Sequence, residues 1–329
     1  MRRLVLAALA VLLLGAASPA DEAKRVLATS DPASFNYFEI KAGLGPDGFQ
    51  RLMDTVSEAM LAPQDPGGGR DLTRSPCWSR RQAEIMGGLL LANLSPSMEA
   101  YGADQRAARA ALSRLEGFRP RLAAGEDVGP PYEASLKQLR AAAASGDARK
   151  AELLRRAAQD QIARQHLQAV WGHGSWAGPL SANAVKYLEP ILSVEVCEVD
   201  QANTAWLKGE VRDHGWFAIS AYGAQVDNQA WLLVQHADHD RDFQRQTLKL
   251  LESLLASRDT SPKNYAYLYD RVAVADDRPQ RYATQGGCTT AGAWRPYPVE
   301  DAARVDEVRA AVGLGPFADY AAQLKDSCG

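Results

Sequence analysis

The stretch Trp231-Leu-Leu-Val-Gln-His-Ala-Asp238 joins four large apolar residues directly to a group of polar ones. On a helix, residues three and four positions apart share a face, so Leu232, Gln235 and His236 lie on one side. The other apolar side chains cover the remaining faces, which predicts a helix buried on most sides. The glutamine and the histidine at its end then need hydrogen-bond partners or a wet cavity. We therefore predict a polar site that a hydrophobic core holds in place.

The segment that follows, from Asp240 to about Ser257, has the pattern of an amphipathic helix. Its apolar stripe comprises Phe243, Thr247, Leu250, Leu251 and Leu254. Gln244 lies in line with leucines of the same helix, so its amide points at the interior. A buried amide costs a few kcal/mol unless it is hydrogen-bonded. We therefore expect Gln244 to bond to a group at the site.

Two short runs beyond this helix alternate between polar and apolar residues. They are Arg271-Val-Ala-Val-Ala275 and Gln280 to Gln285, separated by Asp276-Asp-Arg-Pro279. The alternation predicts a small β-hairpin near residues 271–285. Asp270 enters this hairpin and Gln285 leaves it, so its open end presents both. We expect six side chains to converge there: Gln235, His236, Gln244, Asp270, Arg271 and Gln285.

The remainder of the chain has mostly helical patterns. The predicted fold is therefore mainly α, an irregular helical bundle or an array of helical hairpins, with the one small β-hairpin. The loop from Gly125 to Pro131 is rich in glycine and proline and is the best candidate boundary. It separates an N-terminal helical region, residues 21–125, from a helical domain, residues 132–329, that carries the polar cluster.

Upstream of the cluster, a helix from Asp147 to about Val170 carries Asp160, Gln161 and Arg164. Asp160 and Arg164 are four positions apart, a spacing that favours an ion pair on the helix surface.

The first 20 residues have the features of a signal peptide. Arg2 and Arg3 precede an apolar run from Leu4 to Leu14, and Ser18 and Ala20 are small residues at the positions that a signal peptidase reads. The apolar run is too short to span a bilayer. We expect cleavage after Ala20 and a soluble protein that is periplasmic or secreted, with no integral membrane segment.

The charge and the cysteine content bear on the partner, on the kinds of site that the chain can hold and on its disulfides. The net charge is −3 and no basic block is present, which argues against a nucleic-acid partner. The four cysteines include no CxxC pair, which leaves a zinc ribbon or redox motif unsupported. An even number in an exported protein predicts two disulfides, whose pairing the count leaves open. We expect Cys288 to pair with Cys328, near the end of the chain, and Cys77 with Cys197 by elimination.

Several motifs, in the same order, resemble those of a bacterial family of unknown function with QHAD, FQ, DR and YGTQ signatures. They are Gln235-His-Ala-Asp238, Phe243-Gln244, Asp270-Arg271 and Tyr282-Ala-Thr-Gln285, after an Asp160-Gln161 pair like the one upstream in the family. The resemblance covers roughly residues 152–320. Ala283 stands where the family usually has glycine. Since the family has no established activity, the resemblance implies where the site lies and nothing about its chemistry.

Three interpretations of the cluster are open. The favoured one is a binding or interaction module, because buried networks of His, Asp, Arg and Gln residues are usually structural. The second is a hydrolase-like site in which His236 is a general base, Asp270 or Asp238 orients it, and Arg271 holds an anionic group. The third is a metal site of His236, Asp238 and His239, although no recognised ligand motif is present.

We expect no cofactor. Besides the catalytic candidates His236, Asp270 and Arg271, the candidate binding residues are Asp160, Gln161, Gln235, Asp238, Gln244, Gln280 and Gln285.

Overall fold

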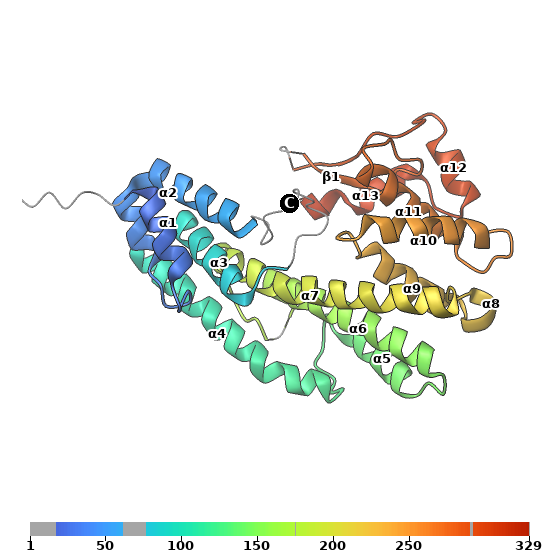
Figure 1. Cartoon of the computed structure of the whole chain (residues 1–329), viewed down its shortest axis with the longest axis horizontal. Helices are drawn as coiled ribbons and strands as arrows, with labels where there is room; N and C mark the ends of the chain where they lie inside the picture. Colours follow the sequence, from blue (N-terminus) through green and yellow to red (C-terminus); the bar gives the residue numbers. More distant parts are fainter. Residues whose placement is uncertain (1–17, 62–76, 175, 290–291, 329) are drawn as a thin grey trace, which may run out of the picture. The chain divides into compact units, whose positions relative to one another are not determined.

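The computed structural model describes residues 18–61, 77–174, 176–289 and 292–328. Almost all of the predicted signal peptide, residues 1–20, therefore lies outside the described residues. Helices dominate the described chain, with one small two-stranded sheet (Figure 1), so the predicted mainly α class is confirmed. Among the described helices, none combines the length and apolar composition needed to cross a membrane.

The chain forms two compact units. The first contains the N-terminal residues together with Trp78–Ala110 and Leu180–Ile191, and the second contains Ala111–Pro179 and Leu192–Gly329. Two long helices, α4 (Met98–Ala123) and α7 (Ala182–His214), contribute residues to both units.

The first unit also holds α1 (Pro19–Ala28), α2 (Tyr37–Leu61) and α3 (Arg80–Leu94). A capping box opens α3, in which the side chains and backbones of Ser79 and Gln82 bond reciprocally. Gly88 on α3 lies against the ring of Tyr37, where a Cβ atom would collide. Glycine at this position therefore lets α2 and α3 pack closely.

The second unit contains the remaining helices and the sheet. Its complete helices are α5 (Glu133–Ala143), α6 (Ala148–Gln168), α8 (Ile219–Tyr222), α9 (Ala224–Gln235), α10 (Arg241–Leu254), α11 (Pro262–Ala275), α12 (Val305–Ala311) and α13 (Phe317–Gln323). A π-helical turn (Ala169–His173) follows α6, and a 3-10 helix (Lys325–Cys328) follows α13.

The helix α9, which contains most of the stretch Trp231–Asp238, lies in the core of the second unit. Leu233 and Val234 are buried in one cluster with residues of α6, α7, α10 and α11, among them Leu153, Leu207, Phe243, Leu251 and Leu268. Full burial of one such side chain stabilises the fold by roughly 1.5–3 kcal/mol. The core therefore holds the polar C-terminal end of α9 in a defined place.

The two-stranded sheet consists of β1 (Gly286–Cys288) and β2 (Trp294–Pro296), which are antiparallel, with Gly287 opposite Arg295. The predicted position of the hairpin, near 271–285, is wrong. Residues 271–275 form the last turn of α11, and Gln280 makes an isolated bridge with Val299. A five-residue alternation of valine and alanine also suits the end of a helix, and periodicity does not separate the two over so short a run.

Both predicted disulfides are confirmed. Cys77 pairs with Cys197 and Cys288 pairs with Cys328, with Cα–Cα distances of 5.7 and 5.4 Å. The second bond ties the 3-10 helix at the end of the chain to β1.

Candidate functional site

His236 is the residue at which α9 ends. Its backbone N–H still bonds to the carbonyl of Leu232, but its φ and ψ angles of −91° and 2° leave the helical range. Its side chain is 19% exposed, whereas the preceding Gln235 is buried. The helix end therefore presents the imidazole at the edge of the core.

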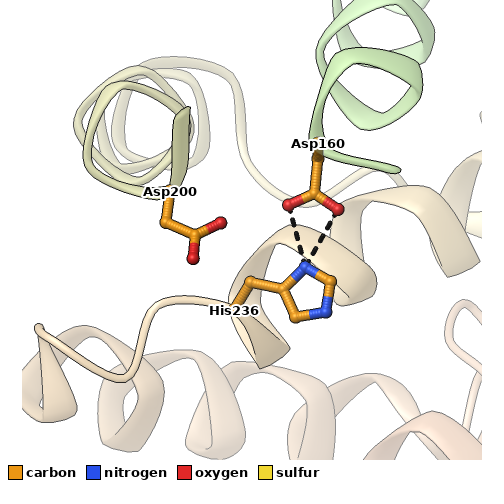
Figure 2. Close-up of side chains that lie close together, drawn as sticks. All are labelled: Asp160, Asp200 and His236. Atoms are coloured by element: carbon orange, nitrogen blue, oxygen red, sulfur yellow. Dashed lines mark hydrogen bonds and ion pairs between the residues drawn. The ribbon is translucent and has the colours of Figure 1, made fainter. Parts of the chain in front are cut away.

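The carboxylate that contacts His236 is that of Asp160 on α6. Nδ1 of His236 lies 2.8 and 3.0 Å from the two carboxylate oxygens, and Asp160 is fully buried. The predicted orienting residues, Asp270 and Asp238, have other partners. Figure 2 shows the second ring nitrogen on the far side of the imidazole from Asp160.

Arg164, one turn beyond Asp160 on α6, connects two carboxylates. Its Nη1 donates to Asp160 at 2.9 Å and to Asp200 on α7 at 3.1 Å, and its Nη2 donates to Asp200 at 3.0 Å. The expected Asp160–Arg164 pair is present, but it is not a surface pair, because Asp160 has no exposed area. Asp200 lies inside the long α7.

The two carboxylates have opposite pKa shifts. Burial raises the pKa of Asp160, but the bond and charge of His236, with Arg164 and Gln161, outweigh it and hold the pKa below its ordinary value. Burial raises the pKa of Asp200 to about 6, and the bond to Arg164 offsets only part of this effect. Asp160 is therefore the ionised partner of the imidazole, and Asp200 is a second group that can exchange a proton.

One ligand atom each of Asp160, Asp200 and His236 lies within 4.8 Å of the other two, a spacing that suits a shared divalent cation. This group differs from the predicted metal set of His236, Asp238 and His239. Nη1 of Arg164 bonds to both carboxylates, so a cationic side chain already lies between them. The arrangement therefore favours proton transfer over metal coordination.

A second polar group surrounds Arg271 on α11. Its Nε donates to Gln235 at 2.9 Å, and its Nη1 donates to both oxygens of Asp238, at 2.8 and 2.7 Å. Gln244 donates to Asp238 and to the carbonyl of Val234, both at 3.0 Å. The inward-pointing amide predicted for Gln244 is thus present, and it links the start of α10 to the end of α9.

A third polar group lies around Asp270. The fully buried carboxylate accepts hydrogen bonds from backbone N–H groups of the turn that includes Tyr282 and Thr284, and from the Thr284 hydroxyl. Gln280 closes the same turn through the backbone of Gln285. The Gln285 amide donates to Thr284 at 3.2 Å. Burial raises the pKa of Asp270, and the N–H groups partly offset the rise. The hydrogen bonds of Asp270 therefore stabilise the turn that includes Tyr282 and Thr284.

The predicted convergence of six residues is therefore divided between separate networks. Gln235, Gln244 and Arg271 share one, Asp270 and Gln285 share another, and His236 belongs with Asp160. Gln161 joins that last group by donating to Asp160 at 2.8 Å.

Sequence reasoning did not assign Arg164 or Asp200 to the site. Asp200, Asn203 and Thr204 are polar residues at helical spacing on α7, and the latter two are buried. That polar stripe inside a long helix is the feature that could have indicated a buried site.

Residues 146–329 match a known family, and this segment includes every residue of the three polar groups. The chain belongs to DUF6624, a family of unknown function. The matched segment extends beyond the range of about 152–320 over which the resemblance was noted. No curated protein and no solved structure matches the chain. The function of this DUF6624 protein must therefore be argued from its own residues.

Proposed function

We propose that this protein is a hydrolase-like enzyme in which His236 is the general base. The observation that carries the proposal is the contact of His236 Nδ1 with both oxygens of the fully buried Asp160. An ionised carboxylate only accepts hydrogen bonds, so Nδ1 carries the proton and the neutral ring keeps its lone pair on Nε2. Asp160 thereby orients the ring and prepares Nε2 to take a proton.

The charges around the ring support this role. Two carboxylates and one guanidinium leave the group of Asp160, Asp200 and Arg164 with a net negative charge when both acids are ionised. A positive charge that develops on His236 is therefore stabilised. Carboxylates whose pKa values shift in opposite directions are also the pattern found where acid and base roles are divided.

Water is the nucleophile that we propose. All four cysteines form disulfides, so the protein has no free thiol to act as the nucleophile. A water proton passes to Nε2 of His236 as the water oxygen attacks the electrophilic carbon or phosphorus of the substrate. The same proton then passes from the imidazolium to the leaving group, which restores the neutral ring.

A panel of chromogenic p-nitrophenyl substrates tests the proposal: carboxylic esters, phosphomonoesters, phosphodiesters and glycosides. We expect hydrolysis of one class, and a fall in kcat of about 100-fold or more in His236→Gln and in Asp160→Asn. His239→Gln is the matched control, because His239 lies three residues away and outside the dyad. Equal activity of His236→Gln and wild type would overturn the assignment.

A nitrogen-15 NMR spectrum of the histidines provides a test that needs no substrate. The neutral ring of His236 is expected to be protonated on Nδ1 in the wild type, and Asp160→Asn is expected to lose that preference. An Nε2–H tautomer in the wild type would refute the proposal. The correct tautomer without hydrolysis of any substrate would instead favour the binding module, in which the dyad ties α6 to α9.

We also infer that the protein acts outside the cytoplasm. The support comes from the two disulfides, which persist in oxidising compartments, and from the N-terminal sequence. The N-terminal sequence of the periplasmic or secreted protein is expected to begin at Asp21. Protein from that fraction that begins at Met1 would contradict the inference.

A further inference from the structure

A groove between α7 and α10 lies outside the three polar groups described above. Its volume is about 400 Å³. The residues that line it are Lys208, Val211, Arg212, Phe243, Gln246, Thr247 and Leu250. Pockets of about 300–1,000 Å³ are the usual size of small-molecule sites in proteins. The groove is therefore large enough for a small organic ligand.

The lining residues form two regular helix faces. Those of α7 are spaced three and four positions apart, and those of α10 follow the same spacing from Phe243 to Leu250. Val211, Phe243 and Leu250 provide the apolar part of the wall. Phe243 is also buried in the hydrophobic core, so the core fixes this part of the wall in place.

Both charged residues in the lining, Lys208 and Arg212, are cationic. Arg212 donates two hydrogen bonds to Asp213, at 2.7 and 2.9 Å, but the two side chains are 75% and 52% exposed. Such exposed pairs contribute little stability, so the guanidinium can exchange Asp213 for a ligand. Lys208 is bonded to Asp240 at 2.6 Å and is itself half exposed. The groove therefore has two cationic side chains beside its apolar wall, each paired with a carboxylate that an anionic ligand can replace.

We propose that this groove binds a small amphipathic anion. The apolar body of the ligand lies against Val211, Phe243 and Leu250, and its carboxylate bonds to Arg212, with Lys208 adding positive charge. A guanidinium binds a carboxylate through two parallel hydrogen bonds, which makes Arg212 the main determinant of the headgroup. This site does not depend on the role proposed for His236.

Calorimetric titration of the full-length protein with decanoate and with decanol tests the proposal. Decanoate is expected to bind saturably at one site, and more tightly than decanol, which lacks the charge. Arg212→Glu is expected to weaken decanoate binding about tenfold or more and to leave decanol binding unchanged. Lys249→Glu is the matched control, because Lys249 is exposed on α10 and outside the lining. It is expected to retain wild-type affinity.

A second variant tests the apolar wall. Leu250→Ala is expected to weaken decanoate and decanol together by several fold, because it removes apolar contact area. Thermal melting of each variant shows whether the fold is retained. The proposal is overturned if decanoate does not bind saturably, if Arg212→Glu and Lys249→Glu lose the same affinity, or if decanol binds as tightly as decanoate. That last result would indicate a purely apolar docking surface.

Discussion

Replacing Asp270 with alanine is expected to destabilise the fold, because its carboxylate holds a buried turn. One oxygen accepts from the backbone N–H groups of Arg281 and Tyr282, at 2.8 and 3.0 Å. The other accepts from the N–H and hydroxyl of Thr284, both at 2.9 Å. Tyr282 and Thr284 are only 6% and 4% exposed, so water cannot readily replace the lost acceptor.

The magnitude follows from these contacts. A buried donor left without a partner costs about 1–3 kcal/mol, and three backbone N–H groups depend on Asp270. Burial raises the pKa of Asp270, which shows that its carboxylate is partly desolvated in the fold. Removing the carboxylate recovers part of that desolvation cost. We therefore expect Asp270→Ala to lower the free energy of unfolding by about 3–4 kcal/mol. Asp270→Asn keeps one acceptor oxygen and is expected to lose about half as much.

Equilibrium urea unfolding followed by circular dichroism measures these differences. Asp319→Ala is the control, because Asp319 is exposed on α13, and it is expected to change stability by less than about 0.5 kcal/mol. If Asp270→Ala unfolds within about 1 kcal/mol of the wild type with an unchanged denaturant slope, the structural role is refuted. Asp270 would then again be a candidate catalytic residue.

Three further predictions concern other parts of the second unit. Burial raises the pKa of Glu195, but His166 and Arg119 outweigh it and bring the pKa from 4.5 to about 2. This stabilisation is present above pH 4.5 and is lost as the pH falls toward 2. In urea unfolding, the free energy of unfolding of the wild type should therefore exceed that of Glu195→Gln by about 3 kcal/mol at pH 6 and by almost nothing at pH 2. A difference that does not change with pH would contradict this prediction. Cys328→Ser opens a loop of 40 residues and is expected to cost roughly 4 kcal/mol, a difference that should disappear when both the wild type and the variant are reduced with dithiothreitol, which opens Cys77–Cys197 in each. Ala283→Val places a β-branched residue at a buried position with φ of 52° and should cost about 2 kcal/mol, whereas Ala283→Gly should be nearly neutral; equal melting temperatures of the two variants would count against this backbone argument.

Local sequence patterns determined the features that depend on one segment at a time. The helical period of α10 places Gln244 on its inner face, and the side chain is indeed buried and bonded. The cysteine count and the export features led to two disulfides. In each case, the prediction depends on the spacing of a few neighbouring residues or on the composition of the whole chain.

Tertiary structure alone decided which polar groups meet. Asp270 and Arg271 are neighbours in sequence, but adjacent residues on a helix point about 100° apart, so α11 directs them into different networks. His236 finds its carboxylate 76 positions upstream, on α6. Periodicity gives the direction of a side chain relative to its own helix, but the packing of whole helices around a shared core determines which helix lies opposite. That packing depends on contacts between many distant residues at once, and no short stretch of this chain contains them.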